Sequence, residues 1–311
     1  FNEGRENPLG PLSVQYADYA VWQREWLSSG ELEKGIRYWK KQLKHLPELH
    51  NLKLDKIRPK KQRFIGKVVQ RRISLSTFDQ IRRLCGEHNV TLFMFMQTVF
   101  SILLSRYSGD NDIVIGTATA GRLHRSVESL IGFFVNDLIL RTDLSGDPEF
   151  ISLLNSNKKM VLDAYSYHHI PFENIVDVIN PERNTGFNPG YQIKIDVQNN
   201  EQQSLSLSEL SLEGIDEFQE SSKYDIHLNV LENEEGMLLR LSYSTDLFLA
   251  ETANRLIDNL LVLIDSILST PNQRISQLKL LSGLERRQLL TDWNNTQADY
   301  ADKYCIHEVF E

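Results

Sequence analysis

The fold is decided by Asp112-Ile-Val-Ile-Gly-Thr-Ala-Thr-Ala-Gly-Arg122 and, after a polar interval, by Ile131-Gly-Phe-Phe-Val-Asn-Asp-Leu-Ile-Leu-Arg141. The runs Ile113–Ile115 and Phe133–Leu140 are rich in branched and aromatic side chains, which predicts two strands. The small residues Gly116–Gly121 between them predict a turn whose backbone lies close to another segment or to an extended ligand. The alternative is two strands and a loop at a sheet edge, without further function.

The chain totals limit the classes of function. With 311 residues the chain can bury a sizeable core in one large or two ordinary domains. Its net charge of −8 and the lack of a basic tract argue against nucleic acid as a partner. Cys85 and Cys305 lack the spacing of a disulfide framework or a zinc site, which fits a cytoplasmic protein. No apolar run has membrane-spanning length, and the polar start at Phe1, without Met, predicts a chain cut from a longer one.

Hydrophobic periodicity predicts a mixed sheet with helices packed against it. The segment 91–107 is apolar nearly all round, so we expect a central buried helix, and we expect Ser76 to cap the helix before it. The other helices are predicted at 11–29 (with a buried aromatic face), 32–46, 76–88, 148–167, from Pro171 onward, 248–268 and 284–293. Besides the two runs above, strands are predicted at 66–75, 191–198, 205–212, 224–232 and 237–244, with a hairpin turn at Glu234-Glu-Gly236.

The adjacent histidines His168 and His169 suggest a catalytic or metal-binding pair. However, neighbouring positions on a helix face different ways, and no acidic or cysteine residue stands at ligand spacing. We therefore predict a structural or surface role for both histidines, and no metal site.

Several motifs resemble the condensation domains of nonribosomal peptide synthetases. The opening stretch is similar to their Asp-Ile-Val-Ile-Gly-Thr-x-x-Ala-Gly-Arg and Gly-Phe-Phe-Val-Asn segments, and residues 16–23 match their Tyr-x-Asp-Tyr-Ala-x-Trp-Gln motif throughout. Pro171-Phe-Glu173, Asn188-Pro-Gly-Tyr-Gln192 with Gln198-Asn199, and Ser222-Lys-Tyr-Asp-Ile226 resemble further family segments. Two departures, Gly190 for the usual Leu and Asp137 for a common Thr, leave substrate preference open.

The resemblance implies an α/β (α+β) fold, a chloramphenicol-acetyltransferase-like lobe with a mixed sheet. It assigns residues 1–270 to the C-terminal lobe of a condensation domain, 271–304 to a linker, and 305–311 to the beginning of an adenylation domain. The family's His-His-x-x-x-Asp-Gly motif does not occur here, since His168-His169 is followed by Ile-Pro-Phe-Glu. We expect that motif upstream of Phe1, in an absent N-terminal lobe, and we expect this chain to be inactive alone.

The implied reaction joins a donor acyl or peptidyl thioester to the amine of an acceptor aminoacyl thioester. No catalytic residue is assigned within the chain. Residues of the Tyr-x-Asp-Tyr motif are expected to be structural: Tyr16, Asp18, Tyr19, Trp22 and Gln23. Candidates for the wall or floor of the substrate tunnel are Gly116, Thr117, Thr119, Arg122, Asn136, Gln198 and Asn199, although Arg122 and Arg141 could instead form structural ion pairs.

The resemblance implies no directly bound cofactor, because phosphopantetheine arms arrive on carrier proteins as substrates. The implied partners are the missing lobe, the upstream and downstream peptidyl carrier proteins and the adjacent adenylation domain, with no nucleic acid and no membrane. Two alternatives remain open. One is a non-catalytic lobe for carrier-protein docking, and the other is an epimerisation-type or cyclisation-type relative.

Overall fold

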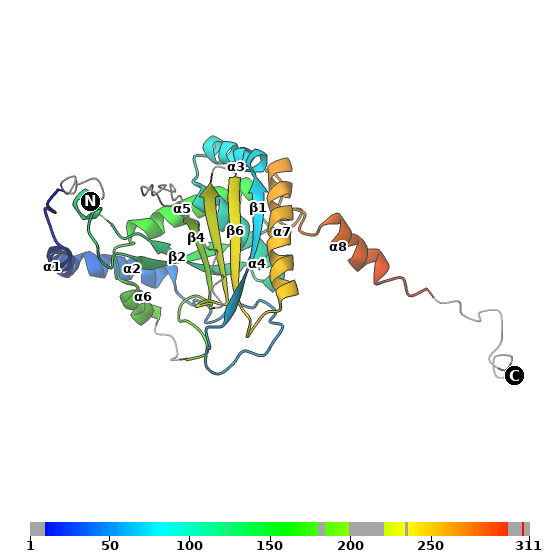
Figure 1. The fold of residues 1–311 in the computed structure, drawn as a ribbon, viewed down its shortest axis with the longest axis horizontal. Coiled ribbons are helices and arrows are strands. Elements are labelled where there is room, and N and C mark those ends of the chain that lie inside the picture. The colour runs from blue at the N-terminus through cyan, green and yellow to red at the C-terminus, as the bar shows by residue number, and fades with distance from the viewer. Residues whose placement is uncertain are drawn as a thin grey trace, which may run out of the picture.

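The computed structural model describes residues 10–122, 124–179, 184–198, 221–233, 236–297 and 307. A six-stranded sheet lies at its centre, in the order β1-β6-β5-β4-β2-β3 (Figure 1). β4 pairs in parallel with β2 and with β5, and the other pairs are antiparallel, so the predicted mixed sheet is confirmed. The strands are β1 (Gly66–Ser74), β2 (Asp112–Thr119), β3 (Asn136–Asp143), β4 (Ile193–Gln198), β5 (Ile226–Asn233) and β6 (Gly236–Ser244).

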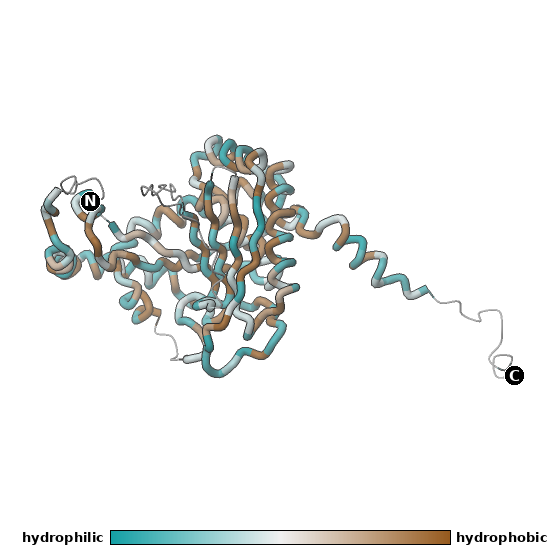
Figure 2. The backbone as a smooth tube through the Cα atoms, viewed as in Figure 1, coloured by the Kyte–Doolittle hydropathy of each residue, from teal (hydrophilic) through white to brown (hydrophobic). Residues whose placement is uncertain are grey.

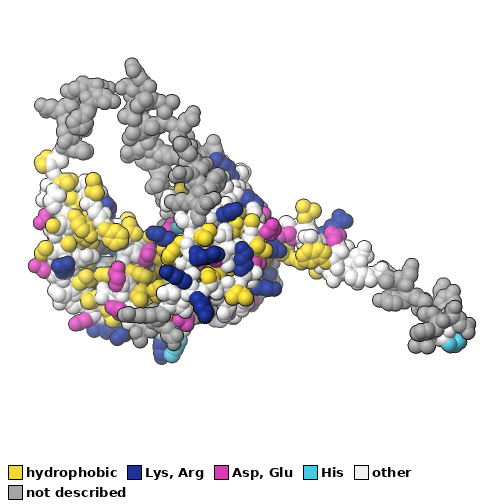
Figure 3. Space-filling view, turned by 60° about the horizontal axis from the view of Figure 1, so that its bottom comes forward, with side chains coloured by type: hydrophobic (Ala, Val, Ile, Leu, Met, Phe, Trp, Pro, Cys, Tyr) yellow, Lys and Arg dark blue, Asp and Glu magenta, His cyan; other side chains and the backbone are white. Residues whose placement is uncertain are grey.

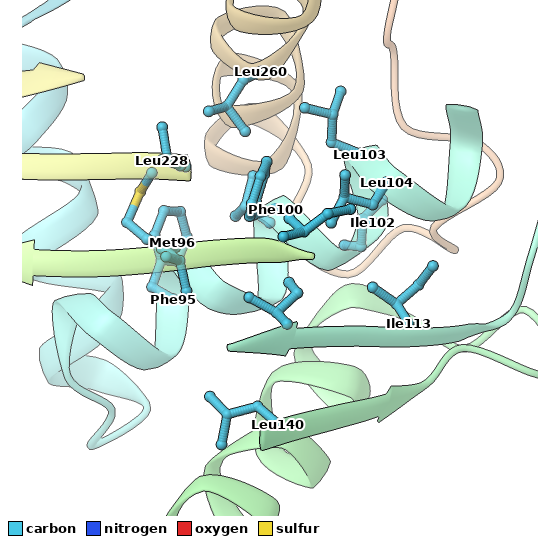
Figure 4. Packing of buried hydrophobic residues seen from close by; sticks show 14 of the residues in the cluster. Phe95, Met96, Phe100, Ile102, Leu103, Leu104, Ile113, Leu140, Leu228 and Leu260 are labelled. Atoms are coloured by element: carbon cyan, nitrogen blue, oxygen red, sulfur yellow. The ribbon is translucent and has the colours of Figure 1, made fainter. Parts of the chain in front are cut away.

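Helix α4 (Leu92–Ser108) is the centre of the core, as its all-round apolar pattern predicted. Thr91 caps it by accepting a hydrogen bond from the Met94 amide at 3.2 Å, and residues 94–105 are all buried. Figure 4 shows Phe100 and Leu103 of α4 between Leu260 of α7 and the strands of the sheet. The helix therefore supports the sheet from within the protein.

The remaining helices pack around this core. α3, α5 and α7 contact both α4 and the sheet, whereas α2 contacts α6, and α1, α2 and α6 lie to the left of the sheet in Figure 1. Apolar stretches concentrate in the sheet and in the helices that pack on it (Figure 2). The bounds of these helices are α1 (Tyr16–Trp26), α2 (Leu32–Gln42), α3 (Leu75–Glu87), α5 (Phe150–Ser166), α6 (Phe172–Ile179), α7 (Ala250–Ser269) and α8 (Gly283–Arg287).

Two sequence predictions about the central strands were wrong. The small residues from Gly116 to Thr119 do not form a turn, because β2 continues through them in register with β3. β3 begins only at Asn136, and Phe133 before it is 79% exposed. Backbone pairing with two neighbouring strands overrides the low intrinsic strand preference of glycine and alanine.

Predictions at helix ends also needed correction. Ser74, not Ser76, caps α3 by accepting a hydrogen bond from the Thr77 amide at 3.3 Å. The aromatic face of α1 is buried only at Tyr19, since Tyr16 and Trp22 are 37% and 44% exposed. A π-helical turn at Leu27–Glu31 joins α1 to α2, and another at Gln288–Asp292 continues α8.

Some predictions fall outside the described residues. The expected strand 205–212, the turn residues 234 and 235, and Cys305 are among them. The expected linker 271–304 begins with residues that pack on the body, because Ile275 and Leu278 are buried and the Ile275 amide donates to the Pro148 carbonyl. Within the described ranges no single helix is long and apolar enough to cross a membrane, although α3 and α4, bent by 104°, pass that test as a pair.

Candidate functional site

The segment expected to form the tunnel floor is part of the sheet. Gly116 pairs with Ile139 of β3 and Lys194 of β4, and a Cβ atom at Gly116 would lie 2.0 Å from the ring of Tyr191. Only glycine therefore lets this ring lie against β2. Thr117 and Thr119 are 1% and 9% exposed, so their side chains are enclosed by the protein.

The segment after β2 turns sharply against β3. Gly121 has φ 63°, and a Cβ there would meet the Phe134 carbonyl oxygen at 1.7 Å, so this position requires glycine. Arg122 holds its guanidinium 4.3 Å from the centre of the Phe134 ring and donates a hydrogen bond to the Val127 carbonyl. No ion pair of Arg122 is seen among the described residues. Arg141, in contrast, forms a bidentate ion pair with Asp112 at 2.8 and 2.7 Å.

Asn136 joins β3 to the turn between α5 and α6. Its Nδ2 donates to the carbonyls of His168 at 2.8 Å and Ile170 at 2.7 Å, and its Oδ1 accepts from the Phe172 amide at 3.0 Å. Both amide protons of Asn136 are thus used inside the chain, so its side chain has no N–H left to donate to a substrate. Gln198 ends β4 in register with Leu231, and Asn199 lies outside the described residues.

A cleft of about 360 Å³, here named the aromatic cleft, opens between α1, the segment before β3, and α6. Tyr16, Tyr19 and Gln23 of the Tyr-x-Asp-Tyr motif form one wall. Two other residues of the motif contact their own segment, because Asp18 accepts a hydrogen bond from the Gln15 amide at 2.8 Å and Trp22 stacks on the ring of Trp26. Other aromatic and polar residues complete the lining: Phe133, Phe134, Phe172, Asp137, His168, His169 and Glu173.

A second cleft of about 450 Å³ adjoins the first. Asp137 and Phe172 line both clefts, so the two spaces meet at these side chains. Tyr191 and Tyr224 form part of the second wall, with their rings stacked 5.6 Å apart. The two clefts therefore lie next to each other at the start of β3.

A charge network lies beneath the meeting point of the clefts. Lys194 Nζ is 3.4 Å from Asp137 Oδ1 and 3.5 Å from Asp196 Oδ2. Burial by itself would lower the pKa of Lys194, but the two carboxylates and Tyr224 raise it above its ordinary value. Burial would likewise raise the pKa of Asp196, but a hydrogen bond from His227, the charge of Lys194 and the Ala118 amide lower it.

The two adjacent histidines line the aromatic cleft and contact neighbouring groups of the chain. His168 Nδ1 contacts the Tyr165 carbonyl, and the His169 ring packs 4.5 Å from the ring of Trp26. Burial and the neighbouring His168 lower the pKa of His169, which keeps it neutral at pH 7. Within the described residues no three His, Cys, Asp or Glu side chains gather as a metal site requires.

Sequence reasoning missed one buried anchor. Asp225 of the Ser-Lys-Tyr-Asp motif receives hydrogen bonds from Arg58 Nη1 at 3.0 Å and from His50 Nε2 at 2.9 Å. Although burial would raise the pKa of this carboxyl, these partners lower it below its ordinary value. The partners are 167 and 175 residues away in sequence, and both lie in the segment between α2 and β1. No local pattern signals such a contact.

The comparisons with known proteins agree with this geometry. The family model described as Condensation domain matches residues 1–290. The chain is 36% identical to a linear gramicidin synthase of Brevibacillus parabrevis and 38% identical to malpibaldin synthetase of Mortierella alpina, over 100% of its length in both cases. It spans only about 6% of each of these relatives.

Among solved structures, the X-domain from teicoplanin biosynthesis matches with a TM-score of 0.79 and 26% identity, over 90% of this chain and 65% of that one. A four-domain nonribosomal peptide synthetase bound to AMP and glycine matches with a TM-score of 0.74 and 25% identity, over 81% of this chain and 20% of that one. The condensation domain of the monacolin K polyketide synthase shares the fold, with a TM-score of 0.75 and 19% identity over 88% of this chain and 65% of that one.

Proposed function

The chain belongs to the condensation-domain family, and from this premise we propose that it is part of a domain that forms amide bonds on a nonribosomal peptide synthetase. The acceptor's amine nitrogen attacks the donor's thioester carbon, the C–N bond forms, and the C–S bond breaks. The amine loses a proton, and the donor's phosphopantetheine sulfur leaves as a thiol. The phosphopantetheine arms of two carrier proteins are thus substrates, and the proposal includes no resident cofactor.

One observation carries this proposal: two clefts, of about 360 and 450 Å³, meet at Asp137 and Phe172. A reaction between two tethered substrates needs two approaches to one point. We place the floor of the tunnel at β2, where Gly116 lets the ring of Tyr191, a lining residue of the second cleft, approach and where Thr117 and Thr119 are buried. In our proposal these residues shape the floor, Asn136 positions the wall, Gln198 lies along one approach, and Asn199, which is outside the described residues, is a further tunnel candidate.

We place the catalytic histidine outside residues 1–311, in a His-His-x-x-x-Asp-Gly motif of the other lobe. His168-His169 lacks the following Asp-Gly, and its rings are held by Tyr165 and Trp26. A general base must reach the proton that it removes. The tethered positions of these two histidines fit a structural role better, so the chain alone is proposed to be inactive.

The proposed organisation follows the same reasoning. Residues 1–270 form the C-terminal lobe, 271–304 link it to an adenylation domain, and 305–311 begin that domain. The upstream and downstream carrier proteins deliver the two thioesters, the other lobe closes the tunnel, and the assembly works in the cytoplasm. The curated relatives support this arrangement because they are synthases many times longer than this chain.

The test is a condensation assay on two proteins: this chain, and the same chain extended upstream through the other lobe. Each receives loaded donor and acceptor carrier proteins, and intact-mass spectrometry follows a new amide on the acceptor. We expect product only from the extended protein, and we expect that a His169→Phe variant of it keeps most of the activity. Product from the short chain, or loss of product in this folded variant, would contradict the proposal and indicate that His168 or His169 takes part in catalysis.

A second function, docking without catalysis, is favoured by one comparison. The X-domain of teicoplanin biosynthesis has also been solved in complex with OxyB, and it matches this chain with a TM-score of 0.77 and 26% identity. A fold of this kind can therefore serve as a binding surface. If the extended protein makes no amide yet binds loaded carrier proteins, docking is the better assignment.

A further inference from the structure

The aromatic cleft combines aromatic walls with carboxylates. Asp137 and Glu173 are its acidic lining residues, and no Lys or Arg occurs among the described residues that line it. In Figure 3, hydrophobic side chains gather with acidic ones between them on the left part of the molecule, while Lys and Arg concentrate nearer the middle. The cleft therefore combines aromatic rings and neutral polar side chains with a carboxylate at two points.

The charge beneath the cleft is not balanced. Lys194 is shared by Asp137 and Asp196, at 3.4 and 3.5 Å, so one ammonium stands against two carboxylates. Asp196 has further partners, because it accepts from the Ala118 amide at 3.0 Å and from His227 Nε2 at 2.9 Å. Asp137 contacts Lys194 only at this long distance and also shares a hydrogen bond with the Tyr191 side chain, and it is 27% exposed where the two clefts adjoin.

The aromatic wall adds a second attraction for a cation. The rings of Tyr16 and Tyr19 lie 5.2 and 4.8 Å from the ring of Phe134, and Phe133 is 79% exposed. The faces of such rings carry partial negative charge and attract ammonium groups. Arg122 covers the Phe134 ring and Tyr19 is buried, so Tyr16 and Phe133, which are 37% and 79% exposed, are the rings open to a ligand.

We propose that Asp137 is a specificity-determining residue, and that with Glu173 it binds an alkylammonium group of a substrate held in the aromatic cleft. The ammonium is bound between the two carboxylates and against the rings of Tyr16 and Phe133. That it belongs to an aminoacyl thioester rests on the proposed function, whereas ammonium binding itself does not. Its source is either the α-amine of the acceptor or a basic side chain, and the chemistry of recognition is the same.

The test measures the affinity of this chain for three small amides at constant ionic strength, by chemical-shift titration of backbone amides. Alanine methylamide has only an α-ammonium, Nα-acetyl-lysine methylamide has only a side-chain ammonium, and Nα-acetyl-norleucine methylamide has neither. We expect at least one ammonium probe to bind about tenfold more tightly than the norleucine probe, since hydrogen bonds to charged groups are the stronger ones. The tighter of the two identifies the source.

Substitutions assign the binding to these carboxylates. Asp137→Asn and Glu173→Gln should each remove most of the difference in affinity between the ammonium probe that binds, lysine or alanine, and the norleucine probe. Asp177→Asn is the matched control, because Asp177 is exposed on the same helix α6 and does not line the cleft. Glu173 is exposed as well, so its variant keeps the test valid if Asp137→Asn disturbs Lys194.

Equal affinity for all three probes would overturn the proposal. So would ammonium binding that survives both cleft substitutions, or that is lost equally in the Asp177→Asn control. Because the probes contain no thioester and no carrier protein, binding can succeed even if the condensation assay fails. Failure of the ammonium-binding proposal and failure of the proposed condensation function can therefore be distinguished.

Discussion

The contact between β2 and the Tyr191 ring can be tested by adding one methyl group at Gly116. The new Cβ would lie 2.0, 2.2 and 2.4 Å from three carbons of the Tyr191 ring. Ordinary carbon contacts are about 3.5–4.0 Å, so the ring has to retreat by roughly 1.5 Å. It has little space for this, because it is 3% exposed and packs against Phe172 and Tyr224. Overpacking of this kind costs about 1–3 kcal/mol.

We therefore expect Gly116→Ala to lower the free energy of unfolding by about 1–3 kcal/mol, measured by urea denaturation with fluorescence and circular dichroism. The matched control is Gly86→Ala in α3, where an added Cβ meets nothing within 4 Å and helix propensity favours alanine. The double variant with Tyr191→Ala should cost less than the sum of the two single changes, because the clash is gone. The reasoning is refuted if Gly116→Ala is as harmless as the control.

Three further predictions concern buried polar contacts. Asp225→Asn should destabilise the protein by about 3–5 kcal/mol at pH 7, because it leaves Arg58 buried without its charge partner. The folded pKa of Asp225 lies below its unfolded value, so its contribution to stability is full above the unfolded pKa and is lost as pH falls through the folded pKa. The urea midpoint of the variant should therefore vary less between pH 7 and pH 3 than that of the unsubstituted protein. Arg141→Met should lower the free energy of unfolding by about 1–3 kcal/mol, because it removes the bidentate pair with Asp112 and the hydrogen bonds to carbonyls after α2. The control is Arg125→Met at an exposed position, and a decrease in melting temperature no larger than that of the control would contradict this prediction. Asn136→Ala leaves one amide and two carbonyls without partners. Relative to the unsubstituted protein, hydrogen exchange should therefore increase at residues 168–172 by much more than at residues 94–105. Unchanged exchange at residues 168–172 would contradict the assigned role of Asn136.

Regular elements were predictable where the local pattern and the tertiary environment agree. The helix at 91–107 has a Thr cap and an apolar surface all round, and it forms α4 at the centre of the core. The strand predicted at 66–75 forms β1, because its alternating side chains suit a strand that has one neighbour. In both cases local preference and packing favour the same structure.

The errors and omissions come from contacts that are distant in sequence. The small residues of β2 belong to a strand because β3 pairs with each of them and β4 pairs with Gly116. Trp22 looked like a core residue, but its ring stacks on Trp26 near the surface. The site was predictable as a set of segments but not as two adjoining clefts, because Asp137 and Lys194 become neighbours only through the sheet order. Composition and periodicity contain no information on that order.

The same strand order has a consequence for synthesis on the ribosome. Among the described strands β1 pairs only with β6, and Gly66 faces Ser244, which lies 178 positions later in the chain. At a translation rate of roughly 5–20 residues per second, β6 is synthesised about 10–35 s after β1. During that time the unpaired edge of β1 could recruit another nascent chain, but Lys67, Arg71 and Arg72 place positive charge along it. The basic residues of β1 thus guard against aggregation while the last strand of the sheet is still being translated.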